Sequence, residues 1–427
     1  MTNSNTASAA LPDNFTLIDL AKSGGWKAFA STGIACPLAW GFIINAIGAT
    51  EPTGQIPWTV SYLVLAVAVI AFAAISRSIP AFFTSQSMEL IAAVLGAAST
   101  VFMVLSFTVF DSVSIQYLTT ILCACVLGWL YLQWGTFYAQ LGLRSTVCYL
   151  FLANIGGSTI KAFSHFIPIW GQCLLGMALP VLSVVMCKIA IENARKGANP
   201  TMRFESHNMR GLWKVAVAIA AFSFVVAFLV NQNSIPVADF LMSRLFEIAI
   251  SAIVLFITVG LNKPFNFSQL WRIALLVLAL DLLTQAAFPE ITILRCVESS
   301  AWDLIVLFAW LTLSDIAHHS KLSAPWVFGI GWACYTAPFA IGSIAASAYP
   351  AGAIDAPVIV ALMFVLVLLS TFCLELRDQD TKWLFAELRG EPVSEPSDFR
   401  SIDERCEEVG KQHGLTPREL EIMQLLC

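Results

Sequence analysis

Twelve apolar stretches run along this chain, and each is long enough to cross a lipid bilayer as a helix. A bilayer core takes about 20 apolar residues, and inside it only a helix or a closed barrel satisfies its own backbone hydrogen bonds. Hydrophobic residues make up 58% of the 427 residues and charged residues 12%, whereas soluble domains carry about 25% charged residues. The sequence therefore predicts an all-α, polytopic membrane protein.

A polar segment at 191–212 divides the predicted spans into two groups of six. The first half, residues 26–190, holds apolar stretches at 27–47, 58–75, 88–110, 117–138, 146–166 and 169–189. The second half, residues 213–374, holds stretches at 213–230, 245–260, 270–287, 297–317, 326–348 and 357–374. Outside this membrane domain, 26–374, we expect a cytoplasmic N-terminal segment at 1–25, a cytoplasmic linker at 375–413 and a helix at 414–427.

The distribution of basic residues predicts the orientation of the spans. With the N-terminus in the cytoplasm, the segments on that side ahead of the C-terminal tail carry thirteen Lys and Arg residues, and the opposite side carries only Lys161, Arg244 and Arg295. Lys and Arg accumulate in cytoplasmic loops. Residues 1–14 lack the pattern of a cleavable signal peptide. We therefore expect a multi-pass protein of the plasma or inner membrane with both termini in the cytoplasm.

The six-plus-six division around a basic loop resembles the major facilitator architecture, in which two bundles surround a central cavity. Transporters of that kind carry a Gly-x-x-x-Asp signature between spans two and three, followed by Arg-rich residues. The corresponding loop, from Ser76 to Phe83, reads SRSIPAFF and lacks it. The resemblance therefore implies the fold and gives less support to transport, since fold alone does not fix function.

The last fourteen residues, GLTPRELEIMQLLC, carry every local signal of a helix start. Thr416 suits an N-cap, Pro417 falls at the first helical position, and Glu419 completes a capping box. Leu415 and Leu420 have the spacing of a hydrophobic staple. Apolar residues then recur at helical spacing.

These residues resemble the first helix of a LuxR-type helix-turn-helix domain, which reads L-T-x-R-E followed by an apolar stretch. The matching positions are Leu415, Thr416, Pro417, Arg418, Glu419, Leu420, Leu425 and Leu426. The resemblance implies a DNA partner and a homodimer on DNA, with the recognition helix beyond residue 427. Residues 375–427 hold 13 acidic and 7 basic residues, so this segment itself is not expected to bind DNA phosphates.

Charged residues inside predicted spans are the best clue to a ligand site, because each is costly in a bilayer unless it is paired or wet. Asp281 and Asp303 lie at similar depths in the ninth and tenth spans, and Glu247 follows Arg244 at the start of the eighth. Arg295 lies in the outer loop nearby. These groups are expected to converge on an outward cavity that binds a cationic or polar small molecule. The alternative is a set of structural ion pairs and snorkelling side chains.

Other polar residues give weaker signals. Lys161 and His165 share a helix face, which leaves pH sensing open as an option, and His318 and His319 are expected in a loop. None of the 11 cysteines forms a C-x-x-C pair, and no phosphate loop, nucleophile elbow or catalytic triad occurs. We therefore expect no enzyme activity, no metal and no cofactor.

Two classes of function remain from the sequence. The first is a membrane-bound LuxR-family transcriptional regulator that senses a signal through its spans and binds DNA. The second is a major-facilitator-like secondary transporter of a small solute, for which the tail helix is incidental.

Overall fold

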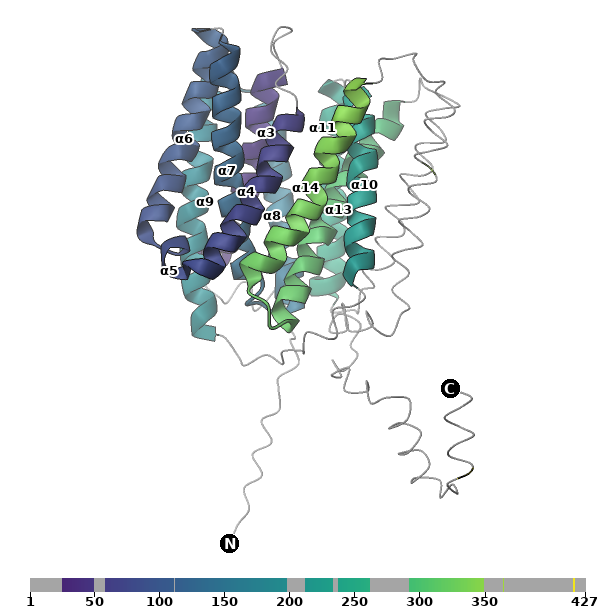
Figure 1. The fold of residues 1–427 in the computed structure, drawn as a ribbon. Helices are drawn as coiled ribbons and strands as arrows, with labels where there is room; N and C mark the ends of the chain where they lie inside the picture. The colour runs from purple at the N-terminus through teal and green to yellow at the C-terminus, as the bar shows by residue number, and fades with distance from the viewer. Residues whose placement is uncertain are drawn as a thin grey trace.

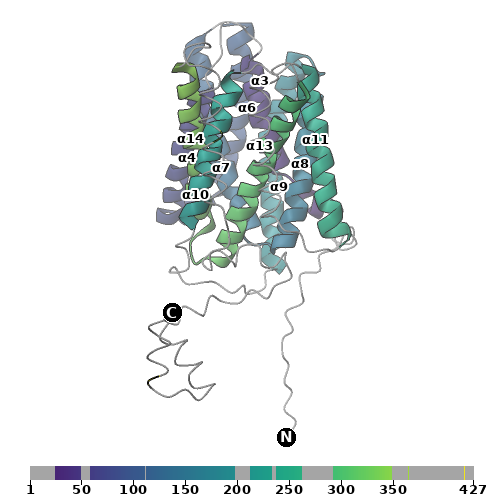
Figure 2. The same ribbon diagram turned by 90° about the vertical axis from the view of Figure 1, so that its right-hand side faces the viewer.

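Long, nearly parallel helices make up the described part of the chain (Figures 1 and 2). The structure is a computed structural model that describes residues 25–49, 58–110, 112–197, 212–232, 237–261 and 292–348, together with Phe364 and Arg418. Within these residues every regular element is a helix. The prediction of an all-α, polytopic membrane protein is confirmed.

The first half contains eight of the described helices. They are α2 (Gly25–Ala30), α3 (Ala35–Ala49), α4 (Trp58–Ser78), α5 (Pro80–Phe83), α6 (Gln86–Thr108), α7 (Val113–Tyr138), α8 (Leu143–Ser164) and α9 (Ile169–Gly197). In the second half the described elements are α10 (Leu212–Gln232), α11 (Val237–Leu255), its π-helical continuation η2 (Phe256–Gly260), α13 (Thr292–His319) and α14 (Ala324–Ala348).

Six of the described helices are long and apolar enough to cross a membrane: Thr59–Ser78, Gln86–Thr108, Val113–Tyr138, Ile169–Ala194, Phe240–Gly260 and Ala324–Ser347. Two shorter apolar helices cover Ala35–Ile47 and Trp213–Phe228. The expected spans at 270–287 and 357–374 lie outside the described residues, apart from Phe364, which is helical.

The first predicted span, 27–47, is interrupted. Turns at residues 31–34 separate α2 from α3, and Pro37 falls in the first turn of α3, where its missing N–H is tolerated. Gly33 lies in this break against Trp134 and Met186, and a Cβ there would come within 2.6 Å of the Met186 Cβ. The break thus places α2 beside α9. By contrast, Pro180 and Pro338 lie inside continuous helices.

The two ends of the bundle can be told apart by the connections that lie there. We call the lower end the one with the α4–α6, α7–α8 and α13–α14 connections, and the upper end the one with the α6–α7 and α8–α9 connections (Figure 1).

Helices α4 and α14 make the most extensive contact between the two halves. At the upper end the Thr59 and Ser343 hydroxyls share a hydrogen bond of 2.7 Å, and the Tyr62 and Phe339 rings stack with centroids 4.0 Å apart. Further down, Gly329 lies so close to α4 that a Cβ would meet the Val69 carbonyl oxygen at 3.0 Å. Because the glycine lacks a side chain, the two backbones approach closely, as small residues allow in membrane helices.

Aromatic side chains close the lower end between the halves. The Trp310 ring of α13 lies 5.6 Å from Tyr131 and 6.1 Å from Tyr138, both of α7. Gly135 of α7 lies directly against the Phe328 ring of α14. Trp310 and Phe328 are fully buried. Two further contacts join the halves here: His318 Nδ1 lies 2.9 Å from the Ala139 carbonyl oxygen, and the Arg77 guanidinium lies 5.9 Å from the Trp326 ring centroid.

Substituting Gly329 by alanine tests the close approach of α4 and α14. The new Cβ would fall 2.5 Å from the Ala73 Cβ, so we expect Gly329→Ala to destabilise the fold by about 1–3 kcal/mol, as overpacking does. Gly156→Ala is the matched control, because its Cβ would meet only the Ala35 Cβ at 3.8 Å and alanine favours the helix. Thermal unfolding in detergent checks both variants. Equal midpoints for Gly329→Ala and the native protein would contradict the expectation.

Candidate functional site

A ladder of polar side chains joins α8 of the first half to α11 of the second. Asn154 Nδ2 donates a hydrogen bond of 3.0 Å to Ser251 Oγ, and Ser158 Oγ donates one of 2.6 Å to Glu247 Oε2. One turn further along α8 comes Lys161. The α8 residues are spaced i, i+4 and i+7, so they share a face, and this face meets the polar face of an antiparallel α11.

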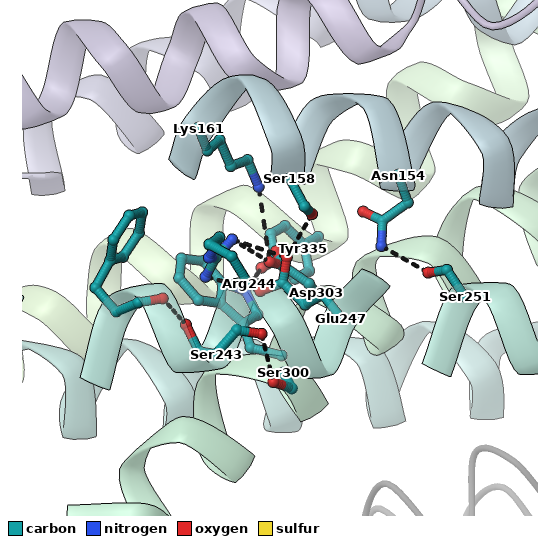
Figure 3. A network of polar contacts seen from close by, with 12 residues as sticks. Asn154, Ser158, Lys161, Ser243, Arg244, Glu247, Ser251, Ser300, Asp303 and Tyr335 are labelled. Carbon is teal, nitrogen blue, oxygen red and sulfur yellow. Dashed lines mark hydrogen bonds and ion pairs between the residues drawn. The ribbon is translucent and has the colours of Figure 1, made fainter. Parts of the chain in front are cut away.

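Four charged side chains, which we call the charged cluster, lie together at the upper part of this ladder (Figure 3). They are Lys161 of α8, Arg244 and Glu247 of α11, and Asp303 of α13. The Arg244 Nη2 atom lies 2.8 Å from Glu247 Oε1, and Nη1 donates to Glu247 Oε2 at 2.9 Å and to Asp303 Oδ2 at 2.8 Å. Lys161 Nζ lies 3.6 Å from Asp303 Oδ2. One guanidinium therefore holds both carboxylates.

The charged cluster is largely shielded from solvent. The Glu247 side chain is 1% exposed, Arg244 6%, Lys161 11% and Asp303 15%. Aromatic rings also face the two cations, Lys161 and Arg244. The Phe240 ring centroid lies 4.9 Å from the Arg244 guanidinium carbon. A buried ion pair is sustained only when its charges are balanced and hydrogen-bonded. The cluster meets this condition with two basic and two acidic groups.

Neighbouring serines hold the backbone of the cluster in place. Ser300 Oγ of α13 donates a hydrogen bond of 3.1 Å to the Ser243 carbonyl oxygen of α11. Ser243 Oγ in turn donates to the Phe240 carbonyl oxygen at 2.7 Å. These bonds tie α13 to α11 within one turn of Arg244 and Asp303, so the positions of these two charged residues depend on each other.

An aromatic group borders the cluster on the side of α14. Trp302, which precedes Asp303 in α13, donates its Nε1 hydrogen to the Tyr335 hydroxyl, and its ring stacks on Phe339 with centroids 5.7 Å apart. Tyr62 of α4 stacks on the same phenylalanine. Tyr335 lies beside the charged side chains in Figure 3. Trp302 and Tyr62 are half-buried, whereas Tyr335 and Phe339 are buried.

The structure brings together three of the five residues expected to form a ligand site: Arg244, Glu247 and Asp303. Asp281 lies outside the described residues. Arg295 belongs to the first turn of α13 rather than to a loop, and its side chain lies outside the described part of the chain.

Lys161 is the member of the cluster that the sequence analysis missed. A usable signal was present, because Asn154, Ser158 and Lys161 form a polar stripe on an otherwise apolar helix.

The expectation that His318 and His319 lie in a loop is wrong. Both belong to the last turn of α13, where basic residues favour the helix dipole. His319 Nδ1 lies 3.0 Å from Asp315 Oδ1, and His318 contacts the end of α7 as described above. This pair belongs to the closed lower end, far along α13 from the charged cluster.

Comparison with known proteins bears on the fold. No protein-family model and no curated protein match the chain. The human organic anion transporter MFSD10 (TETRAN) matches 82% of this chain and 98% of its own, with 14% identity and a TM-score of 0.58. A bacterial homologue of the iron transporter ferroportin in an outward-facing state matches 82% of this chain and 97% of its own, with 12% identity and a TM-score of 0.52. The major facilitator superfamily transporter FucP, in the outward conformation, gives a TM-score of 0.46 at 12% identity, over 81% of this chain and 98% of its own.

The chain therefore shares the fold of MFSD10 and of the ferroportin homologue over most of its length. At these identities the likeness establishes the fold and not the solute.

The prediction of a LuxR-type regulator that binds DNA as a homodimer is wrong. The solved structures that share this fold over most of the chain are transporters, and no LuxR-type family model matches. The residues that carried the prediction were Leu415, Thr416, Pro417, Arg418, Glu419, Leu420, Leu425 and Leu426. They lie outside the described residues, apart from Arg418, which is helical and exposed. A capping box and a staple occur at many helix starts, so they do not identify a DNA-binding domain.

Removing Arg244 tests the charge balance of the cluster. Arg244→Gln leaves two carboxylates against one lysine in a buried site, so we expect a loss of about 3–5 kcal/mol of folding stability. The double variant Arg244→Gln/Glu247→Gln restores the balance and should recover most of that loss. Thermal unfolding and the monodisperse yield after detergent extraction measure both. A double variant as unstable as the single one would show that charge balance is not the cause.

Proposed function

We propose that this protein is a secondary transporter that moves a small polar or charged solute across a cell membrane. The observation that carries the proposal is the charged cluster, which is buried between the two halves and takes residues from both. Ionisable groups within spans are costly and mark substrate or ion pathways. In transporters built from two bundles, the site lies between them and one bundle rocks against the other.

Two of the contacts between the halves suit such motion in different ways. The α4–α14 contact is apolar and close-packed around Gly329, whereas the α8–α11 contact is a polar ladder that ends in the cluster. A change in the charges of the cluster alters the second contact directly. The lower end, closed by Trp310 and Phe328, is the natural position of a gate.

The lower end is proposed to face the cytoplasm. Five basic residues with described side chains lie in that part of the bundle: Arg77, Arg144, Lys188, Lys214 and Lys321. Two basic side chains are described in the upper part, Lys161 and Arg244, and both belong to the cluster. The positive-inside rule then supports a cytoplasmic lower end in a plasma or inner membrane.

A bulky side chain introduced at the proposed gate tests transport without changing the charged cluster. Gly135→Leu would push the Phe328 ring away and oppose closure of the lower end. Overpacking of about 1–3 kcal/mol shifts a two-state equilibrium by about five- to 150-fold, so transport should fall by a similar factor. Gly171→Leu is the matched control, since its nearest contacts are Ile167 and Pro168 of its own segment.

The measurement is untargeted mass spectrometry of small solutes in cells that express each variant at equal membrane levels. The native protein and Gly171→Leu should change the cellular content of at least one solute, and Gly135→Leu should not. The proposal is contradicted if no solute differs between cells with and without the native protein, or if Gly135→Leu retains the full difference.

A further inference from the structure

We infer that the charged cluster binds a monovalent organic anion in place of the Asp303 carboxylate, between Lys161 and Arg244, and that one proton enters the cluster with each anion. This inference rests on the proposed transport function and adds to it the class of solute and the coupling ion. Four observations carry it: the accessibility of Asp303, the anchoring of Arg244, the charge balance and the aromatic group.

Asp303 is the most exposed member of the cluster and bridges the two halves. Its Oδ2 atom lies 2.8 Å from Arg244 Nη1 of the second half and 3.6 Å from Lys161 Nζ of the first. The lysine contact is the longest in the cluster and thus the easiest to exchange. A carboxylate or sulfonate offers the same oxygen acceptors as Asp303. An anion in that position would join the halves as the aspartate does now.

Arg244 stays in place when Asp303 moves away. Both of its terminal nitrogens contact Glu247, and Glu247 is fixed in turn by Ser158 of α8. A solute cation could therefore compete only with Lys161. It would bring a third positive charge beside two carboxylates, and burying that excess charge is unfavourable unless the lysine leaves or loses its proton. An added anion needs a matching proton in the same way, but Asp303 is the more exposed of the two exchangeable groups, which favours an anion over a cation.

The charge balance of the cluster explains why one proton is taken up together with the anion. The cluster holds two basic and two acidic groups, so an added anion leaves one excess negative charge in a buried site, which is strongly unfavourable. Two neighbouring carboxylates readily share one proton, and Asp303 is free to accept it once the anion has replaced it. Other titratable groups near the pair in the described residues are Tyr62 of α4, His165 after α8 and Tyr335 of α14. The tyrosines are neutral at physiological pH, and His165 lies against Phe240 rather than against either carboxylate.

The aromatic group beside the cluster indicates the body of the anion. Trp302 directly precedes Asp303 in α13, and both Trp302 and Tyr62 are half-buried against Phe339. Such rings stack favourably on another aromatic ring. An anion with a phenyl-sized apolar body would satisfy both the cations and this surface.

Binding of two permanently charged probes to the full chain in lipid nanodiscs tests the inference. Benzenesulfonate is an anion that carries no proton of its own, and phenyltrimethylammonium is a cation with the same ring. Calorimetric titration in buffers of different ionisation enthalpy gives the number of protons taken up. We expect benzenesulfonate to bind with about one proton and to weaken about tenfold per unit rise in pH over the range where that proton is taken up.

Variants at Lys161 and Asp303 separate the roles of these two side chains. Lys161→Gln should weaken benzenesulfonate binding by about tenfold or more, the effect of losing one charge-assisted contact, and Lys161→Arg should retain most of it. Asp303→Asn should bind without proton uptake and without pH dependence. Glu89→Gln, which breaks only the Lys188–Glu89 pair near the lower end, is the matched control and should match the native protein.

Three results would overturn the inference: no binding of benzenesulfonate, binding without proton uptake, or tighter binding of phenyltrimethylammonium. None of these results depends on movement of a solute across the membrane. The cellular experiment with Gly135→Leu tests transport separately. The inferred class of solute can therefore be contradicted while the proposed transport function still holds.

Discussion

The Arg244 guanidinium, shared by Glu247 and Asp303, is the interaction on which the relation between the two halves depends. It links α11 to α13 within the second half, and through Ser158 and Lys161 both carboxylates reach α8 of the first half. A buried pair of this kind adds little net stability but is costly to break on one side. The cluster therefore acts more as a sensor of charge between the halves than as a source of stability.

The remaining contacts between the halves fit around this cluster. Helices α4 and α14 approach closely through Gly329 and hold the halves together on one side. Aromatic rings of α7, α13 and α14 close the lower end. Close-packed interfaces have discrete arrangements rather than continuous ones. A change of charge in the ladder can thus be expected to select between two arrangements of the halves.

The all-α, multi-pass character followed from the sequence, because the length of apolar stretches reflects the bilayer directly. Arg244, Glu247 and Asp303 could be singled out because charge within a span is conspicuous. Lys161 was harder to recognise, because at the end of a span a lysine usually snorkels. The polar stripe that it forms with Asn154 and Ser158 shows its partners only once the neighbouring helices are known. The break at residues 31–34 depends on contacts of Gly33 with distant helices. The C-terminal sequence pattern led to a wrong prediction of function, because capping signals are local and occur at many helix starts.

The most direct test of the account is the distance across the lower end, measured between spin labels at Gln140 and Leu322 in lipid nanodiscs after replacement of the native cysteines. These residues follow α7 and α13 and lie on opposite halves. We expect two populations, one with a short distance for the closed end and one with a longer distance, whose proportions change between acidic and alkaline buffer. A single short distance under both conditions would contradict a mobile gate controlled by the charged cluster.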